Sequence, residues 1–285
     1  MTLDEWLRKS EALLRAGPHP ERARPDAELL LRHLLKLERA ALLVRWKEVL
    51  DEREAAHLEE LLQRRLAGEP IQYIIGEAEF YGLPFRVTRD VLIPRPETEH
   101  VVEKAIALAG GFHQPRIVDV GTGSGAIAIA LAHELPQASV TAIDVSEQAL
   151  EIALENARRN SVSDRIRFTR GDLLAPVAGE LFDLVVSNPP YVATSERESL
   201  AVEVRDYEPA IALFAGQDGI SIYRQLIPAA RRVLEPGGFL VMEIGYNQAE
   251  PVGTLLLAEG FDTIEFTPDL QGIPRVASAR RVVIV

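Results

Sequence analysis

Hydrophobic positions in the first seventy residues recur at the spacing of amphipathic helices. Near the N-terminus, apolar side chains fall close to helical spacing at Leu3, Trp6, Leu7, Leu13 and Leu14. A second segment runs from 27 to 37 after Pro25-Asp26, and a third spans 51–67, with Gly68 at the position of a C-terminal cap. These segments predict a small bundle of four or five helices over residues 1–70. We expect both tryptophans, Trp6 and Trp46, in its core.

Between about 71 and 95 the pattern changes to short apolar stretches separated by glycine and proline. The stretches begin at Tyr73, Ala78 and Phe85, and this arrangement predicts a β-hairpin that links two domains. Pro94-Arg-Pro96 ends the hairpin. Glu97 then opens a helix, because acidic residues in a first turn interact favourably with the helix dipole.

From residue 116 onward, short apolar strands alternate with amphipathic helices. Strands rich in Val, Ile and Leu that alternate with helices are typical of a parallel sheet covered on both faces. The chain is therefore predicted to be an α/β protein with a small N-terminal all-α domain and a β-hairpin connector. The predicted strands are 116–120, 139–143, 165–169, 182–187, 238–244, 261–266 and 280–285.

A glycine-rich loop follows the first of these strands. It reads Gly121-Thr122-Gly123-Ser124-Gly125 and leads into the apolar helix 126–132. Glycines let the backbone turn sharply and approach a ligand closely, and a helix N-terminus offers free N–H groups. The spacing is G-x-G-x-G, which disfavours the pyrophosphate of a dinucleotide.

Carboxylates follow the next two strands. Asp144 is placed to accept both ribose hydroxyls of a nucleoside, although it can also be an N-cap, a role that Ser146 can take instead. Asp172 can accept an adenine amino group while Leu173 lies against the ring. The alternative for Asp172 is an ordinary turn carboxylate.

The fourth strand runs into Asn188-Pro189-Pro190-Tyr191. Two prolines cannot donate to a sheet ladder, so the strand ends here and leaves a stiff loop. The loop offers an amide, carbonyl acceptors and an aromatic ring, which together suit a planar NH2 group. Taken alone, the four residues are equally compatible with a Pro-Pro turn.

These four strand ends lie at the carboxyl edge of the predicted sheet, where open α/β folds bind ligands. Because the glycine loop carries no Lys or Arg for phosphate, the nucleoside ligand is better interpreted as S-adenosylmethionine than as NAD or ATP. The sequence has no cysteine, and its six histidines lack metal-ligand spacing, so no metal site is predicted.

At this point the chain resembles class I S-adenosylmethionine methyltransferases of the amino-methylating group, with a Rossmann-like, seven-stranded, mostly parallel sheet. More narrowly, it resembles the HemK/PrmC family, the protein-(glutamine-N5) methyltransferases of peptide chain release factors. The similarity extends over essentially the whole chain. Pro274, before Arg275, departs from the family pattern, where a polar residue is more frequent. The blocks that carry the resemblance are Asp26-Ala-Glu-Leu-Leu-Leu, Pro70-Ile-Gln-Tyr-Ile-Ile-Gly76, Phe80-Tyr-Gly82, Leu92-Ile-Pro-Arg-Pro-Glu-Thr-Glu99, Asp119-Val-Gly-Thr-Gly-Ser-Gly125, Asn188-Pro-Pro-Tyr191, Tyr207-Glu-Pro209, Ala215-Gly216, Asp218-Gly219, Pro236-Gly-Gly238, and Glu243-Ile-Gly245 with Gln248.

The resemblance implies methyl transfer to the glutamine amide nitrogen of the Gly-Gly-Gln motif in class 1 release factors, which modulates translation termination. It implies a helical substrate-recognition domain (1–70), a hairpin linker (71–95) and an S-adenosylmethionine-dependent methyltransferase domain (96–285). Asn188 and the Pro189 carbonyl would accept the two N–H bonds of the substrate amide. Tyr191 would pack on the substrate beside Pro190, and Asn188 would also border the cofactor.

Composition narrows the remaining alternatives. With 31 basic against 43 acidic residues, the formal net charge is −12, which opposes a nucleic-acid substrate. The absence of a signal-like N-terminus and of a membrane-length apolar run predicts a cytoplasmic protein without a membrane partner, and we expect a monomer. A nucleic-acid amino-methyltransferase, a ribosomal-protein glutamine methyltransferase and a cofactor-binding regulator stay open. Whether Arg95 and Glu97 contact cofactor or substrate also stays open.

Overall fold

A computed structural model describes residues 1–283. By its internal contacts the chain forms two compact units. The helical unit contains Met1–Gly76 together with Leu200–Tyr207, and the sheet unit contains Glu77–Ser199 and the chain from Glu208 onward. Residues 200–207, which the sequence analysis assigned to the methyltransferase domain, thus make their contacts with the N-terminal helices.

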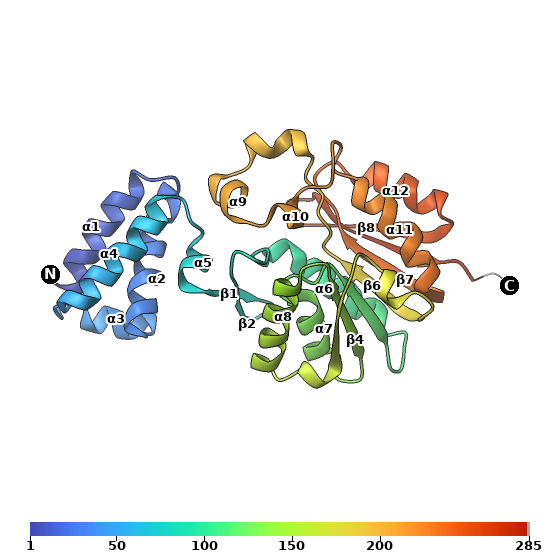
Figure 1. Cartoon of the computed structure of the whole chain (residues 1–285), viewed down its shortest axis with the longest axis horizontal. Helices are drawn as coiled ribbons and strands as arrows, with labels where there is room; N and C mark the ends of the chain where they lie inside the picture. The colour runs from blue at the N-terminus through green and yellow to red at the C-terminus, as the bar shows by residue number, and fades with distance from the viewer. Residues whose placement is uncertain (284–285) are drawn as a thin grey trace. The chain divides into compact units, whose positions relative to one another are not determined.

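The helical unit is built from amphipathic helices around one apolar core (Figure 1). Trp6, Leu30 and Leu58 are fully buried at its centre. The helices α1 and α4 begin with capping boxes: the Thr2 and Asp51 side chains each accept a backbone N–H, and their own backbone N–H groups donate to Glu5 and Glu54. Its elements are α1 (Leu3–Arg15), η1 (Pro20–Arg22), α2 (Ala23–Leu35), α3 (Arg39–Arg45), α4 (Glu52–Leu66), α5 (Ile71–Ile75) and α9 (Val202–Tyr207).

Two expectations for this region were wrong. Residues 71–75 form the short helix α5, because Pro70 starts a helical turn and Gly76 ends it with a φ of 76°; the hairpin begins only after Gly76. Trp46 is 41% exposed. Trp46 lies just beyond the end of α3, a helix in which Leu42 alone is buried. Its apolar side chain predicted a place in the core, but the backbone at this position does not direct it there.

In the sheet unit, the hairpin of β1 (Glu77–Phe80) and β2 (Leu83–Arg86) precedes a seven-stranded sheet of the described residues. The strand order is β5-β4-β3-β6-β7-β9-β8, parallel except for the pairs that involve β9. The order reverses between β3 and β6, the point where open α/β sheets bind ligands. The strands are β3 (Arg116–Val120), β4 (Ser139–Asp144), β5 (Ile166–Arg170), β6 (Phe182–Ser187), β7 (Leu234–Glu243), β8 (Phe261–Pro268) and β9 (Pro274–Arg281).

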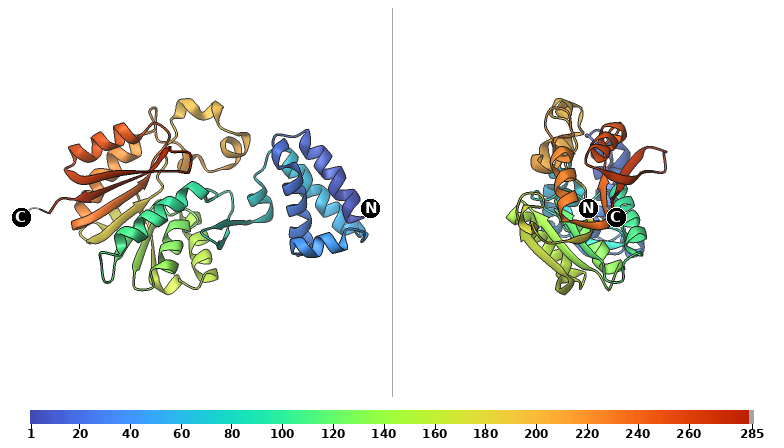
Figure 2. Two further views of the ribbon diagram at one scale, coloured as in Figure 1. Left: turned by 180° about the vertical axis from the view of Figure 1, so that it is seen from behind. Right: turned by 90° about the vertical axis from the view of Figure 1, so that its right-hand side faces the viewer.

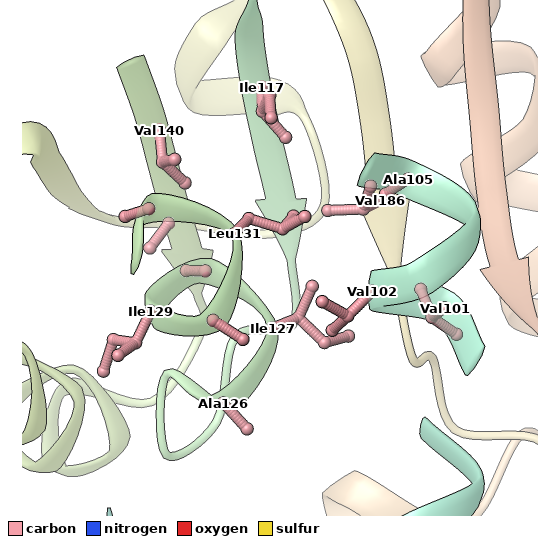
Figure 3. Close-up of a cluster of buried hydrophobic side chains, with 14 of the residues drawn as sticks. Val101, Val102, Ala105, Ile117, Ala126, Ile127, Ile129, Leu131, Val140 and Val186 are labelled. Carbon is pink, nitrogen blue, oxygen red and sulfur yellow. The ribbon is translucent and has the colours of Figure 1, made fainter. Parts of the chain in front are cut away.

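Alternate residues of the central strands enter two different cores, as the two-residue period of a strand requires. Ile117 packs with one cluster and Val118 with the other. Figure 3 shows Val102 of α6 and Leu131 of α7 packed against the face that carries Ile117. In Figures 1 and 2, α11 and α12 lie over the opposite face. The helical segments of this unit are η2 (Pro96–Thr98), α6 (Glu99–Ala109), α7 (Ala126–Glu134), α8 (Glu147–Arg159), η3 (Ser163–Arg165), η4 (Ala175–Val177), η5 (Thr194–Ser199), α10 (Ala210–Leu213), α11 (Ser221–Val233) and α12 (Ala249–Ala258).

The predicted fold class is confirmed, and one strand was misplaced. The last strand was expected at 280–285, but it runs from Pro274 to Arg281 between β7 and β8; positions 284–285 of that expectation lie outside the described residues. The buried stretch Val276–Ala279 is made largely of small side chains. The Val/Ile run that predicted a strand lies after it, at 282–285.

Candidate functional site

A cavity of ≈ 460 Å³ opens at the carboxyl ends of β3, β4, β5 and β6. Most residues predicted to bind cofactor or substrate line it, although they come from four separate strand ends. From the sequence-predicted set, the lining contains Gly121, Thr122, Gly123, Ser124, Asp144, Asp172, Leu173, Asn188, Pro189 and Pro190. Gly125 and Tyr191 are absent from the lining.

The glycine loop is held open toward this cavity. Gly121 and Gly123 have φ values of 72° and 55°, and a Cβ on either would meet no atom within 4 Å. The backbone N–H groups of Gly121 and Thr122 both donate to the Ile143 carbonyl at 2.9 Å, which ties the loop to β4. Open space over a left-handed backbone suits the close approach of a flat ligand.

Gly125 has a different role from the other two glycines of the loop. Its φ is 84°, and an added Cβ would lie 2.8 Å from Ile129 Cδ1 and 3.2 Å from Ala153 Cβ. These atoms belong to α7 and α8. Glycine is needed here for the packing of the two helices, as the third glycine of such loops often is.

Of the two roles that the sequence left open for Asp144, the N-cap of α8 belongs to Ser146 instead, and the ribose contact stays a prediction. Its Oδ2 accepts the Gly123 N–H at 2.8 Å, and its Oδ1 accepts the Ser146 N–H at 2.9 Å. Ser146 is the N-cap of α8, accepting from Ala149 at 3.1 Å. A carboxylate has about four lone-pair directions, so Asp144 retains acceptor capacity on the cavity side.

Asp119 lies beneath the loop. The sequence predicted no role for it beyond its place in the family block 119–125. It is fully buried, and its Oδ2 accepts the Thr122 hydroxyl at 2.6 Å. Burial raises the pKa of Asp119 to about 7, against the opposing effect of the Thr122 hydrogen bond. Asp119 thus fixes Thr122, a residue of the cavity wall.

The end of β5 brings Asp172 and Leu173 to the same wall. Asp172 is exposed, and Leu173 adopts a φ of 47°, an uncommon conformation for a bulky residue. Gly171 N donates to the Asp144 carbonyl at 2.9 Å, which joins this turn to the end of β4. Strained backbone beside a cavity is typical of a ligand-contacting turn.

The Asn188–Tyr191 loop divides between the cavity and the protein interior. Asn188, Pro189 and Pro190 line the cavity, whereas the Tyr191 hydroxyl donates to Glu243 Oε1 at 3.1 Å. Burial, with the nearby Glu243 carboxylate, raises the pKa of Tyr191. The expected stacking of Tyr191 on substrate therefore stays a prediction.

Two residues that the sequence did not single out are linked to this loop by hydrogen bonds; Thr98 also lines the cavity, and Glu243 does not. The Asn188 amide donates through Nδ2 to Thr98 Oγ1 at 3.0 Å, and Thr98 donates to Glu243 Oε2 at 2.6 Å. Thr98 and Glu243 are 4% and 2% exposed. Burial raises the pKa of Glu243, while hydrogen bonds from Thr98 and Tyr191 lower it. The only sequence signal was that Thr98 and Glu243 fall in blocks of the family resemblance.

Arg95 lines the cavity, and its guanidinium pairs with Glu208, which is 6% exposed. Glu97 is absent from the lining and acts on the site through its charge, which raises the pKa of Glu243. Within residues 1–283, no group of three or more metal-ligating side chains is found. In the same range, no helix combines the length and apolarity needed to cross a membrane.

Comparison with known proteins matches both parts of the chain. A family model described as the PrmC N-terminal domain matches residues 5–76, and one described as the methyltransferase small domain matches residues 102–204. Among solved structures, the hMettl16 catalytic domain in complex with a MAT2A 3′UTR hairpin has a TM-score of 0.58 at 18% identity, over 82% of this chain and 84% of that one. A methyltransferase from Pyrococcus furiosus gives 0.51 at 16%, over 82% and 100%. At such identities these structures show the fold alone.

Curated relatives are much closer in sequence. The release factor glutamine methyltransferase of Bradyrhizobium diazoefficiens is 45% identical over 283 residues, covering 98% of this chain and 95% of its own length. That of Koribacter versatilis is 43% identical over 282 residues, covering 99% of both. Identity of this degree over nearly the full length of both chains shows common membership, and the chain therefore belongs to the family of release factor glutamine methyltransferases.

Proposed function

We propose that this protein transfers a methyl group from S-adenosylmethionine to the side-chain amide nitrogen of the glutamine in the Gly-Gly-Gln motif of class 1 release factors, in the cytoplasm, and so modulates translation termination. The observation that carries the proposal is the conjunction of full-length similarity to relatives of that name with a cavity that joins the glycine loop to Asn188 and Pro189.

The chemistry of the loop supports an amide acceptor. An amide nitrogen is a weak nucleophile because its lone pair is delocalised into the carbonyl. Asn188 Oδ1 and the Pro189 carbonyl would accept its two N–H bonds, hold the amide plane and aim the nitrogen at the methyl group. They would also stabilise positive charge growing on nitrogen; by analogy with oxyanion-hole donors, each is worth about 3 kcal/mol. We assign no general base, because the nitrogen becomes acidic once methylated.

We propose that the adenosine part of the cofactor lies between the glycine loop and the ends of β4 and β5. Asp144 would accept the ribose hydroxyls, Asp172 the adenine amino group, and Leu173 would pack on the ring. The glycine backbone of 121–123 would border the rest of the cofactor. Bound S-adenosylmethionine would supply the methyl group; as the S–CH3 bond breaks, the sulfur keeps the electron pair and departs as a neutral thioether, which needs no acid.

The decisive experiment is methyl transfer from labelled S-adenosylmethionine to a purified class 1 release factor. A Gln→Ala variant of its Gly-Gly-Gln motif, a ribosomal-protein fraction and RNA serve as parallel substrates. Label on the wild-type factor alone is expected. Label on ribosomal protein or on RNA, with none on the factor, would overturn the substrate assignment; the likeness to an RNA-bound domain concerns the fold only, and the net charge of −12 opposes RNA.

Asp144→Ala is expected to weaken S-adenosylmethionine binding by at least about tenfold, since it removes the ribose acceptor and the carboxylate that holds Gly123. Isothermal titration calorimetry measures the change. Asp164→Ala, which removes an exposed carboxylate from η3, is the matched control and should bind normally. Equal affinities in both variants would remove Asp144 from the cofactor site.

A further inference from the structure

The amide of Asn188 has two ends of nearly the same shape and opposite hydrogen-bonding character. Only the oxygen can accept an N–H bond from a substrate NH2 group; the NH2 end would face that group donor to donor. Steric fit does not separate the two orientations, because oxygen and NH2 are almost the same size. Something else in the structure must decide which end of Asn188 faces the cavity.

The hydrogen bonds from Asn188 to Thr98 and from Thr98 to Glu243 determine the orientation of the Asn188 amide. An ionised carboxylate only accepts, so at 2.6 Å from Glu243 the Thr98 hydroxyl must donate its single proton to Glu243. The Thr98 oxygen is then left with lone pairs alone for its other neighbour. Asn188 therefore meets it with Nδ2, at 3.0 Å, and Oδ1 is left for the cavity side.

We propose that Glu243 is a positioning residue which, through the Thr98 hydroxyl, fixes the amide orientation of Asn188 so that its oxygen faces the substrate NH2 group. The inference rests on the proposed function and deepens it. It gives roles to Thr98, which also lines the cavity, and to Glu243, which is absent from the cavity lining.

The position of the loop backbone depends on a separate group. Gln248 donates from Nε2 to the Tyr191 carbonyl at 2.9 Å, and its Oε1 accepts the Gly245 N–H at 2.9 Å. The Tyr223 hydroxyl holds the backbone carbonyl of Glu243 at 3.0 Å. Changes to the Thr98 hydroxyl or the Glu243 carboxylate thus leave these main-chain contacts in place.

The charge on Glu243 makes the orientation dependent on pH. Burial and the Glu97 charge from η2 raise its pKa above the ordinary 4.5, while hydrogen bonds from Thr98 and Tyr191 and the Arg275 charge from β9 lower it. Tyr223 of α11 faces it as well. A protonated Glu243 can donate to Thr98, which then donates to Asn188 and favours the inactive orientation. Turnover should therefore fall as pH drops through this raised pKa.

The first test removes the Thr98 hydroxyl while keeping the shape of the side chain. Thr98→Val, Thr98→Ser and the control Thr254→Val, on the exposed face of α12, are compared for kcat with release factor and for S-adenosylmethionine affinity. Thr98→Val should lose about tenfold or more in kcat, the value of one hydrogen bond, with cofactor affinity unchanged. Thr98→Ser and the control should keep wild-type kcat. Unchanged kcat in Thr98→Val, or an equal loss of cofactor affinity, would overturn the proposal.

The second test removes the charge. Glu243→Gln can still accept from Thr98 but cannot titrate, so the acid limb of the kcat–pH profile should be lost while some turnover remains. Persistence of the wild-type acid limb in Glu243→Gln would overturn the role of its charge. If the wild-type protein labels the factor and the variants match it, this inference alone fails. If the wild type labels no factor, the proposed function fails and the inference with it.

Discussion

Asn188→Ala is expected to lower turnover on a release factor by at least ~10²-fold while S-adenosylmethionine affinity changes much less. The alanine removes the acceptor that would hold the substrate amide in the transition state. Asn188 lines the cavity, and its amide donates to Thr98, which lies outside the glycine loop, so we expect the loop to keep its conformation. Single-turnover methyl transfer and calorimetric cofactor binding measure the two quantities.

Asn160→Ala provides the matched control, since its amide donates to the Pro84 carbonyl at 3.0 Å, near the hairpin and outside the cavity lining. It should retain wild-type turnover. An Asn188→Ala protein that turns over as fast as Asn160→Ala would exclude Asn188 from the reaction, and it would favour the reading of the loop as an ordinary Pro-Pro turn.

The parts of the site that the sequence predicted are those set by local rules. A strand followed by Gly121-Thr-Gly-Ser-Gly125 and a helix fixes where the loop lies, and parallel strands bring their carboxyl ends to one edge. Asp144, Asp172 and Asn188 could therefore be placed together from strand predictions alone. The cavity lining agrees with that expectation.

The contacts behind the site could not be predicted in this way. Thr98 and Glu243 are separated by 145 positions; Glu243 ends an apolar strand, whereas Thr98 lies between two glutamates. Nothing in a hydrophobic pattern tells which buried carboxylate will meet which hydroxyl. The hydrogen bond from the Tyr191 hydroxyl to Glu243 was equally unpredictable, although the stacking of the Tyr191 ring on substrate stays a prediction.

The segment 200–207 illustrates a second limit. Its few apolar residues gave no reason to separate it from the methyltransferase domain, yet it joins the helical unit. Val202 lies against Gly68, and the Tyr207 hydroxyl donates to the Ala67 carbonyl at 2.9 Å. Glu203 meets Arg65, at 3.1 Å, through a bond that spans 138 positions. Contacts between residues so far apart in the sequence form only in the folded unit, so the local spacing of apolar residues cannot predict them.

Arg65 is the centre of that attachment, and Arg65→Met is expected to destabilise the helical unit by about 3 kcal/mol. Its guanidinium is 2% exposed and donates to Asp26 Oδ2 at 2.8 Å, to the Glu69 carbonyl at 2.9 Å and to Glu203. Asp26, 1% exposed, would be left buried, and its ion pair with Arg22 at 3.2 Å would remain. Chemical denaturation measures the loss, and hydrogen exchange of residues 200–207 should become faster.

Lys9→Met is the control, because Lys9 pairs with Glu59 of α4 at 3.2 Å and both side chains are exposed, by 51% and 41%. An exposed pair contributes less than about 1 kcal/mol, so this variant should stay close to wild type. If the two variants lose equal stability, the buried pair has no special role. Adding Asp26→Leu to Arg65→Met should restore part of the loss, since removal of both buried charges is less costly than isolation of one. A double variant less stable than Arg65→Met would show instead that Asp26 stabilises the unit through Arg22.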